Sequence, residues 1–230
     1  MGSEPSVYEK IRRVEVACKR LSVEIQNAIA IHAMWRRMDD YPDLLAAFRN
    51  TPEAIGLNVI QDVLIFRLIS ALTAVHDSPG RNRSSLPSVF KLLGDKAVIR
   101  HFIEEARERF PKIPCYTDRV AMVSAKSLMR AKVGWMRLKE GDGKTWLDTL
   151  RDFRNEHLAH LLFDMKKEKP AKYDYITNLL QRTVPIIDNL HLGLNGHCLE
   201  LSDVKEICAK NADDFWAMVL RGMKAKKKRN

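Results

Sequence analysis

Residues 7–38 read VYEKIRRVEVACKRLSVEIQNAIAIHAMWRRM, and this stretch decides the class of fold. Its apolar residues recur at intervals of three and four, which places them on one face of a helix. The alternation of apolar and polar residues that is typical of strands is scarce along the chain. The helical stripe consists of Val7, Ile11, Val14, Cys18, Leu21, Ile25 and Ile29. The sequence therefore predicts a long first helix, from about Val7 to about Met38.

A central helix is predicted to begin at Thr51-Pro52-Glu53 and to last to about His76. Thr is a good N-cap, Pro fits the first helical turn, and Glu favours the positive end of a helix. The Gly141–Lys144 stretch is interpreted as a tight turn between helices, and Thr145 as the N-cap of a helix over residues 146–165. Further helices are expected at about residues 44–48, 86–93, 96–110, 117–140, 172–192 and 201–223.

These helices predict an all-α fold, a bundle of long antiparallel helices. We expect one domain over residues 1–223 and a basic flexible tail at residues 224–230. The chain has 230 residues, enough to bury a sizeable core, with 46 % hydrophobic and 30 % charged residues. Its net charge of +10 and isoelectric point near 9.5 favour an anionic partner, nucleic acid first and an acidic membrane surface second. Charge alone leaves open that the cations only solvate helix faces.

Neither a secretory segment nor a membrane span is expected. Residues 1–10 contain two glutamates and are not followed by an apolar stretch. The most apolar segment, residues 55–75, is interrupted by Asn58, Gln61, Asp62 and Arg67, a pattern typical of a helix buried in protein. The prediction is a cytoplasmic protein with no membrane partner.

The cysteines are expected to be reduced and to pack as small buried apolar residues. No Cys-x-x-Cys motif occurs in the sequence. The group His191, His197, Cys198 and Cys208 matches no standard zinc spacing, so neither a metal nor a cofactor is predicted.

The segment RDFRNEHLAH, residues 151–160, places cationic and titratable groups within an apolar helical sector. At about 100° per residue, Arg154 falls near the middle of that sector, with His157 inside it and His160 on its flank. A guanidinium does not lose its proton in proteins, so Arg154 needs a partner. Asp62 and Asp77 are the candidates within the chain. Alternatively, the sector opens into a cleft or subunit interface that admits an anion. Internal pairing, with the histidines satisfied in the core, is the structural alternative to a functional site.

Residues 154–160, RNEHLAH, resemble the arginine-to-histidine signature of the HEPN superfamily (higher eukaryotes and prokaryotes nucleotide-binding). The upstream residues Ile69-Ser70-Ala71-Leu72, Asp77 and Ser84-Ser85-Leu86 are similar to the AbiU-type branch, which is associated with bacterial abortive infection. The resemblance spans roughly residues 55–192, and only the seven-residue motif in it is specific.

The resemblance implies a metal-independent endoribonuclease that acts as a homodimer, with RNA as its substrate. It implies catalytic roles for three residues: His160 as general base or acid, Arg154 on the scissile phosphate, and Asn155 orienting the phosphate or the histidine. His157 and Arg151 are additional candidate binding positions, which the family motif does not require. The expected biology is that of a toxin or phage-defence effector, with a possible antitoxin protein as partner. The alternative is a non-catalytic helical dimerisation module that binds nucleic acid or a partner protein.

Overall fold

The computed structural model describes residues 5–49, 51–80, 84–109, 114–160 and 173–227, without the side chains of residues 39, 114–116, 157–160 and 227. Within these ranges the regular structure is entirely helical, which confirms the all-α prediction. The helices are α1 Val7–Asp39, α2 Pro42–Phe48, α3 Glu53–Val75, α4 Leu86–Leu92, α5 Lys96–Glu108, α6 Pro114–Leu138, α7 Gly141–His160, α8 Tyr173–Asn195 and α9 Leu201–Lys227.

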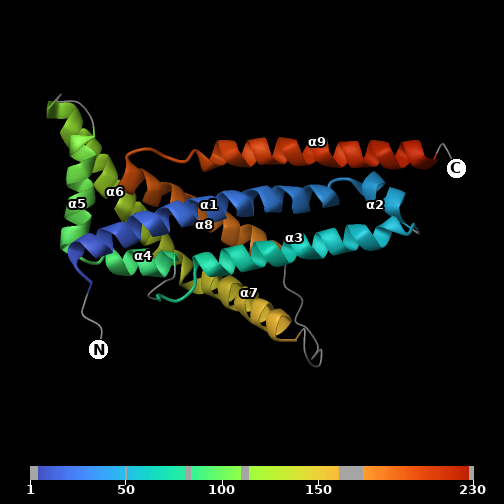
Figure 1. Ribbon diagram of the computed structural model, residues 1–230, viewed down its shortest axis with the longest axis horizontal. Helices are drawn as coiled ribbons and strands as arrows, with labels where there is room; N and C mark the ends of the chain where they lie inside the picture. The colour runs from blue at the N-terminus through green and yellow to red at the C-terminus, as the bar shows by residue number, and fades with distance from the viewer. Residues whose placement is uncertain (1–4, 50, 81–83, 110–113, 161–172, 228–230) are drawn as a thin grey trace.

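Helix α1 is the axis around which the other helices pack. It lies between α9 and α3, and it also contacts α8 (Figure 1). Helix α5 crosses one end of the elongated bundle, while the short α2 lies at the other end beside α9 (Figure 1). Helix α7 packs against α3, α6 and α8. These contacts bring the end of α3 and the second half of α7 together.

The apolar stripe of α1 forms the centre of the main core. Five of its predicted members are at most 2 % exposed, whereas Val7 at the helix start is 41 % exposed. Burial of side chains of this size stabilises the fold by roughly 1.5–3 kcal/mol each. The five buried members are Val14, Cys18, Leu21, Ile25 and Ile29. The periodicity thus identified the buried face of α1 correctly.

A second, smaller apolar cluster lies where α1, α2, α3 and α9 meet. Trp216 of α9 is its largest member and is 1 % exposed. The Trp216 indole Nε1 donates a hydrogen bond to the carbonyl oxygen of Met34 at 2.9 Å. This bond fixes the second half of α9 against α1. The other buried members are Met38, Leu44, Phe48 and Leu57.

Helices α6 and α8 approach each other closely because a glycine lies at their crossing. A Cβ on Gly193 would lie 2.6 Å from the Leu128 side chain, closer than any real contact. The Ser124 hydroxyl donates a hydrogen bond to the carbonyl oxygen of Gly193. This contact also fixes which face of α6 is turned towards the core.

The predicted starts of three helices, α3, α6 and α7, are wrong in detail. Pro52, not Thr51, is the N-cap of α3, and the Thr51 hydroxyl donates instead to the carbonyl oxygen of Phe48 at 2.8 Å. Helix α6 begins at Pro114, before Thr117, consistent with the preference of proline for the first helical position.

The expected turn at residues 141–144 is in fact the first turn of α7, so Thr145 lies inside the helix and does not cap it. Gly141 takes a φ of +55°, which lets α7 begin after only two residues beyond the end of α6. A Cβ on Gly143 would lie 2.2 Å from the carbonyl oxygen of Leu138, so only glycine fits there. Both glycines therefore allow the connection between α6 and α7 to be shorter than the predicted turn.

Helix α9 continues to Lys227 and so includes the first residues of the segment expected to be a basic tail. Lys224 forms an ion pair with Asp43 of α2 at 3.2 Å, and Lys226 pairs with Glu53 of α3. The hydrogen bond from Lys226 lowers the pKa of Glu53. The first lysines of the expected tail thus belong to the helical end of the molecule, and residues 228–230 lie outside the described part.

The cysteine and membrane predictions meet mixed outcomes. Cys18 is buried as expected, and burial raises the pKa of its thiol to about 11, but Cys198 is exposed. Cys115 lies outside the residues whose side chains are described. By length and composition alone, α3 is long and apolar enough to cross a membrane, although polar residues interrupt it. One such helix is weak evidence, because core helices of soluble proteins pass the same test.

Candidate functional site

The candidate site lies where the C-terminal half of α3 packs against α7. The Phe66 and Phe153 rings stack across this contact with centroids 5.7 Å apart. Leu147 and Leu150 of α7 are buried against the main core. This packing fixes the position of α7 along the axis of α3 and brings Arg154 beside the last turn of α3.

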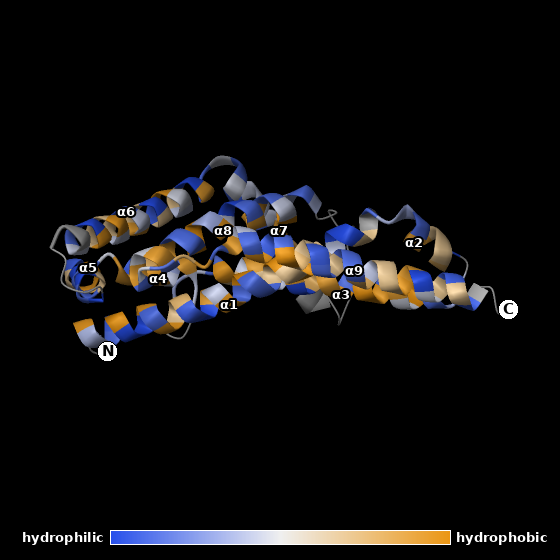
Figure 2. Ribbon diagram, turned by 90° about the horizontal axis from the view of Figure 1, so that it is seen from above, coloured by the Kyte–Doolittle hydropathy of each residue, from blue (hydrophilic) through white to orange (hydrophobic). Residues whose placement is uncertain are grey.

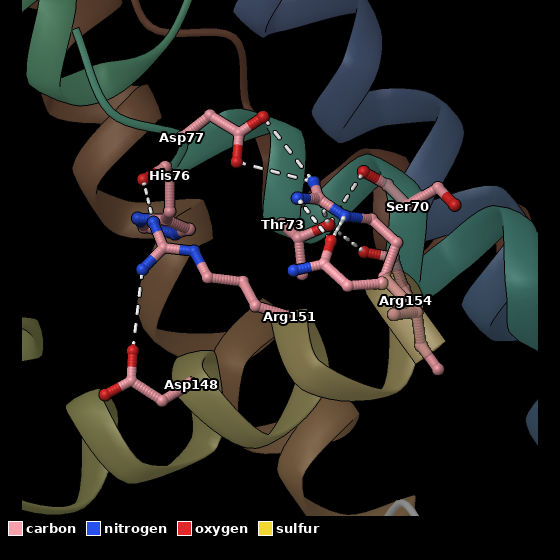
Figure 3. Close-up of polar contacts among 9 residues, drawn as sticks. Ser70, Thr73, His76, Asp77, Asp148, Arg151 and Arg154 are labelled. Atoms are coloured by element: carbon pink, nitrogen blue, oxygen red, sulfur yellow. Dashed lines mark hydrogen bonds and ion pairs between the residues drawn. The ribbon is translucent and has the colours of Figure 1, made fainter. Parts of the chain in front are cut away.

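The inner side of the Arg154 guanidinium is bound by two groups at the end of α3. Its Nη1 donates to the Thr73 hydroxyl at 3.1 Å and lies 3.4 Å from the nearer carboxylate oxygen of Asp77 (Figure 3). The side chains of Arg154 and Asp77 are 21 % and 23 % exposed. Asp77 is therefore the internal partner that the sequence analysis named, whereas Asp62 lies exposed on α3.

Among the side chains that the structure describes, an exposed one covers the outer edge of the same guanidinium. Both Nε and Nη2 of Arg154 lie 3.3 Å from the side-chain oxygen of Asn155. Nε and Nη2 form the edge that binds carboxylates and phosphates in a bidentate manner. Asn155 is exposed, so rotation of its side chain would open this edge to an anion.

Arg151, one turn before Arg154, binds the C-terminal end of α3. Its Nη2 donates to the backbone carbonyl of His76, the C-cap residue of α3, and its Nη1 lies 3.5 Å from an Asp148 oxygen (Figure 3). A cation at the C-terminus of a helix is stabilised by the helix dipole and by the free carbonyl groups there. Arg151 thus already has a structural role, and the binding role suggested for it stays a prediction.

His76 is a buried histidine that the sequence analysis did not single out. The residue is 2 % exposed, and Nε2 lies 2.9 Å from the Thr183 hydroxyl of α8. Its Nδ1 has no hydrogen-bond partner within the described structure. Burial, with a smaller effect from the positive charge of Arg151, lowers the pKa of His76 from 6.5 to about 3. The imidazole is therefore neutral at pH 7, and His76 fixes the turn that carries Asp77.

The structure brings together three of the five predicted site residues: Arg151, Arg154 and Asn155. His157 and His160 belong to the last turn of α7, but their side chains lie outside the described residues. Thr73 was missed because a threonine within a helix carries no distinctive sequence signal. The spacing that could have identified it is that of Thr73 and Asp77, four residues apart and so on one face of the chain as α3 ends.

No group of three or more metal-ligating side chains occurs among the described residues. Two of the histidines considered for a metal, His191 and His197, do pack together with ring centroids 4.8 Å apart. Nδ1 of His191 lies 3.0 Å from the carbonyl oxygen of His197, and burial lowers the pKa of His191. This pair is therefore explained as part of the connection between α8 and α9.

Comparison with known proteins identifies a family. The family model HEPN_AbiU2, described as AbiU2, matches residues 16–215. This range includes α3, α7 and every residue of the candidate site. No curated protein and no solved structure matches the chain.

Proposed function

Because this chain belongs to the HEPN_AbiU2 family, as the sequence resemblance predicted, we propose that it is a metal-independent endoribonuclease of the HEPN type. Its biological role in this proposal is that of a toxin or phage-defence effector in abortive infection, acting as a homodimer. The observation that carries the proposal is the state of Arg154, whose inner side is bound and whose phosphate-binding edge is covered, among the described side chains, by Asn155.

Arg154 is suited to bind a phosphodiester because its position is fixed before the substrate arrives. Thr73 and Asp77 bind Nη1, which limits rotation of the guanidinium. An RNA phosphate would replace the Asn155 oxygen at Nε and Nη2, and the displaced amide could then contact the phosphate itself. A fixed cation at the place where negative charge develops is an effective source of transition-state stabilisation.

The proposed reaction is attack of the ribose 2′-hydroxyl on the adjacent phosphorus. The new O2′–P bond forms as the P–O5′ bond breaks, giving a 2′,3′-cyclic phosphate and a 5′-hydroxyl end. One His160 takes the proton of the 2′-hydroxyl, and the other gives a proton to the leaving 5′-oxygen. The pKa of an unperturbed imidazole, near neutrality, suits both roles. This division of labour requires two copies of the motif and therefore two chains.

An exposed apolar stripe on α3 supports assembly of two chains beside the site. Ile55, Val59 and Val63 lie on the same helical face as Phe66, Thr73 and Asp77 by their spacing. Helix α7 covers the second half of this face, whereas all three residues of the first half are more than half exposed. Exposed apolar stripes of this kind mark interaction surfaces. A second chain bound here would lie next to Arg154.

The ion pair of Arg154 and Asp77 also supports the alternative, a non-catalytic dimeric module that binds nucleic acid or a partner protein. In that reading the guanidinium is satisfied inside the chain, and its role is to join α3 to α7. The two functions differ in one outcome, which is whether RNA is cut.

The test is a gel and end-group assay of purified protein on single-stranded RNA and RNA hairpins in a chelator. We expect products with 2′,3′-cyclic phosphate and 5′-hydroxyl ends, no cleavage by His160→Ala or Arg154→Ala, and no cleavage of DNA, which lacks the 2′-hydroxyl. His101→Ala on α5 and Arg12→Ala on α1 are matched controls and should cut like the wild type.

Equal cleavage by the wild type and both site variants would assign the activity elsewhere. Absence of cleavage on many RNAs would favour the binding module. The proposed toxin role is tested separately, by growth arrest on expression and by its relief when the neighbouring gene, a candidate antitoxin, is expressed as well.

A further inference from the structure

The outer face of α6 carries methionines at a spacing of seven residues. Met122, Met129 and Met136 are 56 %, 63 % and 48 % exposed, and Val133 lies beside them at 40 %. A seven-residue spacing places side chains along a single line of a helix, as in the contact seam of a coiled coil. Figure 2 shows α6 along an outer edge of the molecule, with hydrophobic and hydrophilic bands alternating along it.

Basic residues follow this methionine seam on both sides. Arg130 and Arg137 each follow a methionine by one residue, and Lys132 and Lys139 follow by three, so the two rows lie on opposite flanks. All four are exposed. Between residues 119 and 139 the sequence has no Asp or Glu, although acidic residues are interspersed along most of the chain. The exposed face of α6 is therefore an apolar seam with positive flanks, bounded by Asp118 and Glu140.

The orientation of α6 leaves this seam without a partner in the described structure. The opposite face carries Ser124, Leu128 and Ala131, which are buried, and Leu128 and Ser124 are fixed at Gly193 of α8. Turning α6 to bury the methionines would break these contacts. Three large apolar side chains in one line are thus presented to the outside by the same packing that builds the core.

We infer that the exposed face of α6 is a docking surface for an acidic amphipathic helix of another protein. The Met122–Met129–Met136 seam would bind the apolar stripe of that helix, and the two basic rows would face its Asp and Glu residues. Methionine suits such a surface because its flexible thioether adapts to different side chains. The seam runs from Met122 to Met136, fourteen steps along the helix or roughly 21 Å at 1.5 Å per residue, and so matches a partner helix of about four turns.

Charge and shape favour this partner over three others. A second copy of this chain docked seam to seam would bring the basic rows of both copies together, which costs binding energy. Bases of single-stranded RNA stack on aromatic rings, whereas the seam consists of methionine and valine. Helices that lie in a membrane surface commonly insert Trp, Phe and Leu over a broad face, whereas this seam is narrow and contains none of them.

The probe for this proposal is a synthetic acidic helical peptide with leucines at the seam spacing and glutamates on both flanks. A scrambled peptide of the same composition is its control. By fluorescence anisotropy at low salt, we expect the patterned peptide to bind at least tenfold more tightly than the scrambled one. Met129→Glu should weaken binding at least tenfold. Met218→Glu, at a position on α9 that is 60 % exposed, is the matched control and should leave binding unchanged.

A second variant, Arg130→Glu, tests the charged flank and should weaken binding and lessen its dependence on salt. Circular dichroism should show wild-type helix content for all three variants, since the substituted side chains are exposed. RNA cleavage by Met129→Glu should be unchanged, so this proposal and the proposed function can fail separately. The docking proposal is overturned by equal binding of both peptides, by no binding, or by equal effects of Met129→Glu and Met218→Glu. It is also overturned if Met129→Glu instead removes binding to phosphatidylcholine–phosphatidylglycerol vesicles or to single-stranded RNA.

Discussion

Arg154 of α7 and Asp77, two residues beyond the end of α3, form an ion pair in which Nη1 lies 3.4 Å from the carboxylate. Both side chains are about one-fifth exposed, so the pair lies at the rim of the α3–α7 contact and not in the deep core. A pair in this position orients the arginine while its other edge can still reach solvent.

The variant Asp77→Asn should lower the rate of RNA cleavage by about tenfold, equivalent to about 1.4 kcal/mol, because the guanidinium loses its anchor while the phosphate-binding edge remains. The loss of folding stability should be small, about 1 kcal/mol or less, since the pair is partly screened by solvent. Single-turnover cleavage and urea denaturation measure the two effects. Asp214→Asn, at an exposed position on α9, is the control, and equal effects of both variants would remove Asp77 from the site.

The buried His76 should make the fold sensitive to acid. Its pKa is about 3 in the folded state and near 6.5 in the unfolded chain, so the unfolded chain binds the extra proton between these values. The free energy of unfolding is therefore highest above pH 6.5 and decreases as the pH falls, by up to about 1.4 kcal/mol per pH unit. His32, whose pKa burial lowers to about 4, contributes in the same direction.

Urea denaturation between pH 7 and pH 5 should show this loss of stability. His76→Gln should reduce the slope of the unfolding free energy against pH by up to the equivalent of one proton. His101→Gln on α5, where the side chain is 43 % exposed, is the control. The same pH slope in the wild type and in His76→Gln would contradict the assignment.

The exposed stripe of α3 should be the dimer contact. Val63→Glu places a charge on that stripe and should convert the proposed dimer to a monomer and abolish cleavage, with the helix content unchanged. Val23→Glu on α1 changes a valine of similar exposure, 57 % against 59 %, and should leave the dimer intact. Light scattering at micromolar concentration decides between them. A monomeric wild type would remove the composite site, and a dimeric Val63→Glu would move the interface elsewhere.

The C-terminal lysines should contribute in two separable ways. Truncation after Lys227 removes residues 228–230 and should weaken RNA binding to a similar degree for all sequences, with a smaller salt dependence. Truncation after Met223 also removes the ion pairs of Lys224 with Asp43 and of Lys226 with Glu53. It should therefore increase amide hydrogen exchange in α2 as well. Unchanged RNA affinity at low salt in both truncations would show that these residues do not contact RNA.

The sequence by itself determined the helical class, the buried face of α1 and the family. Apolar residues recur at intervals of three and four over many turns of α1, so the pattern indicates one buried face even where a single residue is ambiguous. The same projection placed Arg154 in an apolar sector, from which its need for a partner followed directly. Helix ends were predicted less well, because Gly141 and Gly143 allow a connection shorter than a typical turn, and this depends on how closely α7 approaches the end of α6.

Only the tertiary structure decided which carboxylate binds Arg154 and what surrounds it. Asp62 lies within α3, and Asp77 lies just beyond its end. The stacked Phe66 and Phe153 rings fix the position of α7 along α3, and this position places Arg154 beside Asp77 and not beside Asp62. Thr73 and His76 belong to the site for the same reason. Thr73 of α3 accepts a hydrogen bond from Arg154, and the carbonyl of His76 accepts one from Arg151, although α7 lies more than seventy residues away in sequence. Contacts of that separation depend on packing, which the periodicity of a single segment cannot specify.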